Sequence, residues 1–199
     1  MSQFQNKVAL ITGSSQGIGK AIAIELAKKG CIVILNGRKQ DKLELVKSAI
    51  EQLGGAAHAI AADVSNFNEA QNLLHETIQR CGKLDMLINN VGVSSRGYIS
   101  ELHPDVLQQV FSSNVNGCIF PTQLALPELR KSKGNIIFIS SLAAIHGLPG
   151  LAPYSASKMA LQAFAEALRI EEHEHQIHVG ILRVAKTAIE HQKQTVGPD

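Results

Sequence analysis

The sequence predicts one doubly wound α/β domain over residues 1–199, with a parallel sheet covered by helices on both faces. Short apolar runs alternate with longer amphipathic segments along the whole chain. The apolar runs are nearly continuous, which is typical of strands buried on both sides of a sheet. A glycine cluster directly follows the first run. Strands that alternate with helices are joined by right-handed crossovers, and ligands of such sheets bind beyond the carboxyl ends of the strands.

Six short apolar runs are predicted as strands, the first of them, "VALIT", rich in β-forming residues. They cover residues 8–12, 31–36, 58–64, 84–90, 134–140 and 177–184. The amphipathic segments between them are predicted as helices, several of which stop at glycine. They cover residues 21–30, 41–55, 68–82, 104–132 and 156–173. Pro121 and Pro127 are possible kinks in the long fourth helix.

Composition favours a globular protein that acts on small molecules. Hydrophobic residues make up 45% of the chain, and the net charge of +2 is too small to predict nucleic-acid binding. No segment approaches the ~20 apolar residues of a membrane span, and the N-terminus lacks an export signal, so we expect a cytoplasmic protein. Cys31, Cys81 and Cys118 are far apart and are expected to stay reduced. The histidines at 173, 175 and 178 carry no zinc signature, so no metal site is predicted.

The glycine cluster is a candidate cofactor loop. In "TGSSQGIG", Gly13 would permit a tight turn, Gly17 a close approach of backbone to phosphate, and Gly19 close packing of helix against strand. The helix that follows would present its N-terminus to an anionic pyrophosphate. A glycine triplet alone is weak support, and a flexible turn is the alternative.

Five motifs in order resemble the single-domain branch of the short-chain dehydrogenase/reductase family. They are "TGSSQGIG" at 12–19, "NNVG" at 89–92, "SNVNG" around Asn114, "FISS" ending at Ser141, and "YSASK" from Tyr154 to Lys158. The resemblance covers essentially the whole chain and implies a Rossmann fold and an oxidoreductase. A metal-dependent alcohol dehydrogenase is a further alternative, but no ligand set supports it.

Tyr154 and Lys158 are separated by four residues, so on a helix they share a face. Carbonyl reduction by hydride requires a proton at the oxygen, which a tyrosine can supply, and a nearby positive charge lowers the pKa of the phenol. The resemblance implies that Lys158 also binds the nicotinamide ribose, that Ser141 polarises the substrate oxygen, and that Asn114 completes a water-linked proton path. These four residues are the predicted catalytic set.

The cofactor is predicted to be NADP rather than NAD. No acidic residue precedes Asp41 after the second strand, and Arg38 offers a guanidinium suited to a 2′-phosphate. The resemblance implies further cofactor contacts, together with Tyr154 and Lys158. They are Gly13, Ser15, Gln16, Gly17, Ile18, Gly19, Asp63, Val64, Asn90, Gly92 and Thr187. Besides Ser141 and Tyr154, the predicted substrate pocket contains Ser94, Ser95, His146, Leu148 and Ile189.

Two departures from the family pattern qualify this interpretation. Val184 and Ala185 stand where the family usually has Pro-Gly. The family also continues through a substrate-covering segment and a seventh strand, and no seventh strand is predicted before Asp199. We therefore expect an open edge at 177–184, with reduced stability and turnover. A non-catalytic cofactor-binding or scaffold protein is the alternative function.

The resemblance also predicts a homodimer or homotetramer. Residues 105–130 and the helix after Tyr154 would pair across a two-fold axis. Val106, Val110, Phe164 and Leu168 are the candidates for this face, with packing inside the chain as the alternative.

Overall fold

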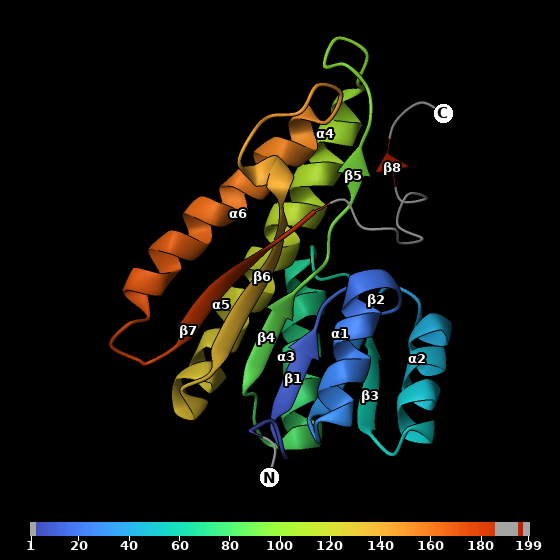
Figure 1. Ribbon diagram of the computed structural model, residues 1–199, viewed down its shortest axis with the longest axis vertical. Helices are drawn as coiled ribbons and strands as arrows, with labels where there is room; N and C mark the ends of the chain where they lie inside the picture. The colour runs from blue at the N-terminus through green and yellow to red at the C-terminus, as the bar shows by residue number, and fades with distance from the viewer. Residues whose placement is uncertain (1–2, 186–194, 197–199) are drawn as a thin grey trace.

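A parallel six-stranded sheet forms the centre of the protein, in the order β3-β2-β1-β4-β6-β7 (Figure 1). The computed structural model describes residues 3–185 and 195–196. The strands are β1 Val8–Ile11, β2 Ile32–Gly37, β3 Ala56–Ala61, β4 Met86–Asn89, β6 Asn135–Ser141 and β7 His178–Val184. The sheet grows outward from β1 in one direction and from β4 in the other, which confirms the predicted doubly wound α/β fold. The switch between β1 and β4 is where a ligand crevice is expected.

Helices cover the two faces of the sheet. They are α1 Gly17–Lys28, α2 Gln40–Gln52, α3 Phe67–Cys81, α4 Pro104–Phe111, α5 Gly117–Ser132 and α6 Ala152–Glu171. Alternate residues of a strand point to opposite faces. Val8 and Leu10 accordingly pack in one core with residues of α3, α5 and α6. Ala9 and Ile11 pack in a second core with residues of α1 and α2. Because β1 is buried on both faces, all four of its residues are apolar.

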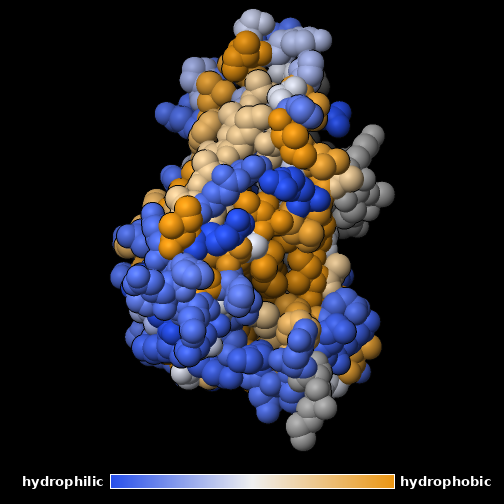
Figure 2. Space-filling view, turned by 60° about the vertical axis from the view of Figure 1, so that its left-hand side comes forward, coloured by the Kyte–Doolittle hydropathy of each residue, from blue (hydrophilic) through white to orange (hydrophobic). Residues whose placement is uncertain are grey.

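β7 is the outer strand on one side of the described sheet, and it pairs in parallel with β6. Leu182 is 51% exposed, and Ile137 and Val184 pack at the border of the core that α1 and α2 cover. Figure 2 brings the α6–β7 side forward and shows apolar side chains gathered around a hollow. Among the described residues no strand pairs with the outer side of β7, and Arg183 is exposed on it, so the open edge at 177–184 stays a prediction.

The predicted helix over 104–132 is divided in the structure. α4 ends at Phe111, a π-helical turn covers Ser112–Asn116, and α5 then runs to Ser132. The turn places the buried Asn114 at its centre. π-Helical turns inside α-helices occur frequently at functional sites. Both Pro121 and Pro127 lie within α5 and do not end it.

Two further features were not predicted from the sequence. α6 begins at Ala152, so Tyr154 lies within the helix rather than before it. Two short strands, β5 Ser94–Ser95 and β8 Thr195–Val196, form a separate parallel pair. They join segments that are about a hundred residues apart in the sequence.

The residues predicted to form a self-association face mostly pack inside the chain. Val110 and Leu168 are buried, with 0% and 3% of their surfaces exposed. Phe164 packs its ring edge against Phe138, at 5.9 Å between centroids. The choice of Val110 and Leu168 was wrong, because both are buried within the chain, whereas Val106 and Phe164 are half-buried and stay candidates. Self-association itself stays a prediction.

The described cysteines carry free thiols. Cys31 and Cys118 are buried, and Cys81 is half-buried. Burial raises the pKa of Cys31 to about 12 and that of Cys118 to about 11.

Over residues 3–185 and 195–196, no helix has the length and apolarity to cross a bilayer. Within the same residues, no group of three or more His, Cys, Asp or Glu side chains is placed to hold a metal ion.

Candidate active site

A cavity of about 770 Å³ lies along the carboxyl ends of the strands. It runs from the loop after β1, past the ends of β2 and β4, to β6 and α6. This is the crevice that the strand order predicts. Most of the predicted site residues line it. They are Gly13, Ser15, Gln16, Gly17, Ile18, Arg38, Asp63, Val64, Asn90, Gly92, Ser94, Ser141, Leu148, Tyr154 and Lys158.

The glycine loop is held from the end of β4. Gly13 has a positive φ of 61°, a conformation that favours glycine. The Asn90 amide donates to the carbonyl oxygens of Thr12 and Gly13, at 2.9 and 3.0 Å. The Thr12 hydroxyl in turn accepts from the backbone N–H groups of Asn90 and Val91, at 3.0 and 3.1 Å. Asn90 therefore fixes the loop as well as lining the cavity, and Thr12 is a supporting residue that the sequence analysis missed.

Gly19 lies behind this loop and does not line the cavity. A Cβ at Gly19 would come within 2.5 Å of Asn90 Nδ2 and 2.6 Å of the Gly13 carbonyl oxygen. The close packing expected of the third glycine is therefore observed. α1 begins at Gly17, and its N-cap residue Gln16 makes no side-chain capping bond. The first N–H groups of α1 therefore lack a side-chain cap at the cavity.

One end of the cavity is cationic. Arg38, Lys39 and Lys42 all line it and are all exposed. A Cβ on Gly37 would lie 3.4 Å from Ser15 Oγ, so Ser15 sits close to the end of β2. The sequence analysis named Arg38 alone. The two lysines were visible in "RKQDK", but only their position at the start of α2 places them on the cavity.

The acidic residue at this end is engaged locally. Asp63 Oδ1 accepts hydrogen bonds from the Ser65 N–H at 3.0 Å and the Ser65 hydroxyl at 2.6 Å. The Asp63 N–H donates to Glu69 at 2.7 Å. These bonds hold the loop between β3 and α3, where Val64 is also on the cavity wall.

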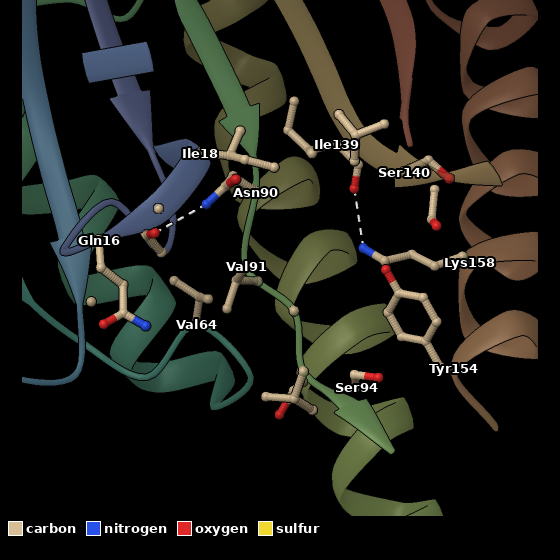
Figure 3. Close-up of a pocket in the computed structure, with 18 of the residues that line it drawn as sticks. Gln16, Ile18, Val64, Asn90, Val91, Ser94, Ile139, Ser140, Tyr154 and Lys158 are labelled. Atoms are coloured by element: carbon tan, nitrogen blue, oxygen red, sulfur yellow. Dashed lines mark hydrogen bonds between the residues drawn. The ribbon is translucent and has the colours of Figure 1, made fainter. Parts of the chain in front are cut away.

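At the other end of the cavity, Tyr154 and Lys158 project from the same face of α6. Figure 3 shows the Tyr154 hydroxyl directed toward the Lys158 amine. Lys158 Nζ lies 5.9 Å from the centroid of the Tyr154 ring and donates to the Ile139 carbonyl oxygen at 3.1 Å. Only 4% of Lys158 is exposed. The two groups thus lie close together on one face of α6, as their spacing predicted, with Lys158 buried and Tyr154 half-buried.

Burial shifts the pKa values of both groups. Desolvation raises the pKa of Tyr154, and a hydrogen bond with Ser141 opposes this rise. Desolvation lowers the pKa of Lys158, and the nearby Cys118 acts in the opposite direction. The expectation that Lys158 would bring the Tyr154 pKa below its ordinary value was wrong for this structure. The reason is that loss of water around the phenolate outweighs the stabilising contacts.

Asn114 lies behind the catalytic candidates with all its side-chain groups engaged. Its Oδ1 accepts from the Val93 N–H at 2.7 Å. Its Nδ2 donates to the Val93 carbonyl oxygen and to Ser157 Oγ, both at 2.9 Å. Asn114 thus ties the segment after β4 to α6. Ser157, which also donates to the Tyr154 carbonyl oxygen at 2.7 Å, is a supporting residue that the sequence analysis missed.

Gly92 lies where no side chain would fit comfortably. A Cβ on Gly92 would be 3.3 Å from both Asn114 Oδ1 and Lys158 Nζ. Such contacts are closer than ordinary van der Waals packing. The bare backbone of Gly92 therefore forms the cavity wall next to these two polar groups. This wall faces the part of the cavity that lies between the glycine loop and Tyr154.

A few predicted residues are not brought to the cavity. His146 is exposed and does not line it. Ser95 is fully buried, pointing away from it. Thr187 and Ile189 lie outside the described residues. Val184 and Ala185, which stand in place of Pro-Gly, do line the cavity, as do Arg96, Leu142 and Leu151.

Comparison with known proteins agrees with this architecture. The chain matches the short chain dehydrogenase family over residues 7–196. It is 44% identical over 167 residues to 11-beta-hydroxysteroid dehydrogenase-like 2 of Arabidopsis thaliana, covering 83% of this chain and 54% of that protein. It is 34% identical over 178 residues to the 3-ketodihydrosphingosine reductase of Mus musculus, covering 86% and 54%. The chain therefore spans about half the length of these relatives.

Solved structures show the same fold. A dehydrogenase/reductase from Sinorhizobium meliloti superposes with a TM-score of 0.90 at 32% identity, covering 94% of this chain and 75% of the other. An NAD⁺-bound xylitol dehydrogenase superposes with a TM-score of 0.89 at 25% identity, covering 92% and 71%. With the family match over nearly its whole length, this chain belongs to the short-chain dehydrogenase family of oxidoreductases.

Proposed function

We propose that the protein interconverts a carbonyl and an alcohol with NADP(H), using Tyr154 as the general acid and base. The observation that carries this proposal is the position of Tyr154 and Lys158. They share one face of α6 and line the same cavity as the glycine loop after β1. A binding module would need the loop alone, whereas a proton donor beside a buried lysine suits chemistry at a substrate oxygen.

The cavity fits a nicotinamide dinucleotide. The first N–H groups of α1 would bind its pyrophosphate. Because Gly92 has no side chain, a flat ring could approach its backbone closely beside Lys158. Such a cofactor supplies or accepts the hydride. Gly13, Gly17, Val64, Asn90 and Lys158 are the proposed cofactor-contacting residues around it, and Thr187 is proposed from the family resemblance.

NADP is proposed over NAD because of the charge at the end of β2. Arg38, Lys39 and Lys42 present three cations near Ser15. A 2′-phosphate carries charge that guanidinium and ammonium groups bind well. The carboxylate of Asp63 would repel a phosphate, but it accepts two hydrogen bonds from Ser65, which hold it in its own loop.

Tyr154 is proposed to deliver the proton during reduction. Because its pKa is raised by burial, the phenol is protonated at neutral pH and is ready to donate to a developing alkoxide. Ser141 bonds with the phenol and would hold the substrate oxygen beside it. Lys158 would supply positive charge close to the proton that moves. Asn114 holds α6 against the segment after β4, which would keep Tyr154 and Lys158 in place at the cavity.

The substrate is proposed to present its carbonyl from a largely apolar body. Leu142, Leu148, Leu151 and Val184 line the cavity near Tyr154. The names of the relatives refer to hydroxysteroid and ketodihydrosphingosine, which are hydroxyl and keto compounds. Ser94, from the segment after β4, lines the same cavity and is the proposed polar contact (Figure 3).

The test is turnover by the purified protein. A panel of ketones and aldehydes with NADPH, followed by loss of NADPH absorbance, should reveal reduction. Tyr154→Phe should abolish turnover and leave NADPH affinity within about twofold. Tyr98→Phe is the matched control, because Tyr98 is 65% exposed and should change neither quantity. NADPH binding without turnover of any carbonyl would favour the non-catalytic alternative. Normal turnover by Tyr154→Phe would remove Tyr154 from the mechanism.

A further inference from the structure

We infer that the substrate carries an anionic group, such as a carboxylate, and that Arg96 binds it. The inference rests on the proposed function, because it assigns the substrate end of the same cavity. It adds a charge requirement to a pocket whose other walls are mainly apolar. It also predicts that Arg96 determines specificity rather than the rate of proton transfer.

The backbone after β4 directs Arg96 into the cavity. Side chains alternate along an extended segment. Ser94 and Arg96 both line the cavity, whereas Ser95 between them is fully buried. The pairing of β5 with β8 holds the backbone at Ser94 and Ser95. The strand pairing therefore holds the backbone up to Ser95, and Arg96 is the exposed residue that follows it at the cavity.

A second contact places Arg96 at the substrate end. The Gly97 N–H donates to the Gly150 carbonyl oxygen at 3.1 Å. This bond joins the residue after Arg96 to the loop before α6. Leu148 and Leu151 of that loop line the cavity. Arg96 thus shares a rim with apolar residues close to Tyr154, and not with the cationic residues at the far end.

The charges around Arg96 leave its guanidinium available to a ligand. Asp63 is the acidic residue among the described cavity residues, and it is bonded to Ser65 near the end of β3. Glu101, the nearest acid in sequence, accepts from the Tyr98 N–H at 3.4 Å. Within residues 3–185 and 195–196, Arg96 forms no ion pair.

A guanidinium beside apolar walls suits one ligand chemistry in particular. Arg96 is exposed at the rim of the cavity, and its donors match a carboxylate in a two-point arrangement. Lys158 cannot serve the same purpose, because its amine is buried against Ile139. The alternative anion is a phosphate of the cofactor, which would also be bound in this cavity. The experiment must therefore separate substrate from cofactor.

The probes are 3-benzoylpropionate and its methyl ester, which share one ketone and differ in charge. Calorimetry with the NADP⁺-loaded protein measures binding, and NADPH consumption measures turnover. We expect the wild-type protein to bind and reduce the acid roughly tenfold better than the ester, about 1.4 kcal/mol. Arg96→Met should remove this preference while leaving the ester unchanged, and Arg96→Lys should retain part of it. Arg80→Met, an exposed arginine on α3, is the control and should change neither.

Each outcome separates the two proposals. A preference for the acid in binding that disappears in Arg96→Met supports the inference, even if no carbonyl is turned over, and in that case the proposed function fails alone. Equal binding of acid and ester by the wild-type protein overturns the inference and leaves the proposed function standing if ketones are reduced. A tenfold loss of NADPH affinity in Arg96→Met, with the acid preference intact, assigns Arg96 to the cofactor and also overturns it.

Discussion

The side-chain amide of Asn114 donates a 2.9 Å hydrogen bond to the hydroxyl of Ser157. Both residues are fully buried, and they belong to elements 43 positions apart in the sequence. The bond connects the π-helical turn between α4 and α5 to α6, one residue before Lys158. The position of Lys158, the proposed catalytic lysine, therefore depends on a contact made between buried side chains behind the cavity.

Ser157→Ala should destabilise the protein and reduce turnover. The change removes the bond from Asn114 and the bond to the Tyr154 carbonyl oxygen. We expect a loss of about 1–2 kcal/mol in the free energy of unfolding, measured by urea denaturation, with a lower kcat and a nearly unchanged KM. Ser155→Ala is the control on the same helix, since its hydroxyl accepts only a long bond of 3.4 Å from Leu148. Equal losses in both variants would argue against a special role for Ser157.

Arg38→Ala should weaken NADPH binding and spare NADH. A lost hydrogen bond to a charged phosphate is worth roughly 1.5–3 kcal/mol. Fluorescence titration with each cofactor gives the two affinities, and raising the salt concentration should narrow the difference between them. Lys131→Ala removes a cation from α5, away from the cavity, and should affect neither. A parallel loss for both cofactors would show that Arg38 does not contact the 2′-phosphate.

Gly19→Ala should disrupt the glycine loop after β1, even though alanine is more favourable than glycine within a helix such as α1. The new Cβ would be 2.5 Å from Asn90 Nδ2, so the bonds from Asn90 to the loop carbonyl groups must shift. Overpacking of this kind costs about 1–3 kcal/mol, and NADPH affinity should fall at least tenfold. Gly147→Ala is the matched control, because no atom lies within 4 Å of its added Cβ. Unchanged affinity in Gly19→Ala would mean that the loop adapts without cost.

Lys158→Met should change how stability depends on pH. Burial lowers the pKa of Lys158 below 10.5, so the unfolded chain binds a proton more readily than the folded protein. The stability of the wild-type protein therefore gains from this group as pH rises through its folded-state pKa toward 10.5. The methionine variant lacks that gain. The free energy of unfolding of the wild-type protein, relative to that of the variant, should therefore increase as pH rises from the folded-state pKa of Lys158 toward 10.5. A difference between wild type and Lys158→Met that stays flat over this pH range would contradict the prediction.

Much of the fold could be predicted from the sequence because its signals are local. The continuous apolar runs and the glycines between them identify six parallel strands, and the spacing of Tyr154 and Lys158 places both on one face of α6. The family resemblance implies an interruption of the helix at Asn114, but the bounds of the three pieces of 104–132 could not be predicted, since Asn114 bonds with Val93 and Ser157, which are distant in the sequence. The pairing of β5 with β8 joins segments too short and too distant for any sequence pattern to indicate.

The candidate site divides in the same way. Most residues within the motifs line the cavity, with Gly19 and Asn114 packed behind it, whereas His146, which was also expected there, is exposed and does not line it. Lys39, Lys42 and Arg96 reach the cavity through the direction of their backbone, which residue type alone does not reveal. The raised pKa of Tyr154 depends on how much water is excluded around it, a property of the folded protein.

The buried thiols allow the opening of this fold to be measured directly. A cysteine is alkylated as its thiolate, so Cys118, fully buried and with a pKa raised to about 11, reacts only when the region beneath Lys158 opens. Its labelling rate in the presence of a thiol reagent reports the free energy of that local opening, and half-buried Cys81 gives a faster reference in the same sample. A ligand that binds only the closed form slows labelling of Cys118 in proportion to its occupancy. Mass spectrometry of the labelled chain can therefore rank cofactors and substrates by affinity even where no turnover is observed.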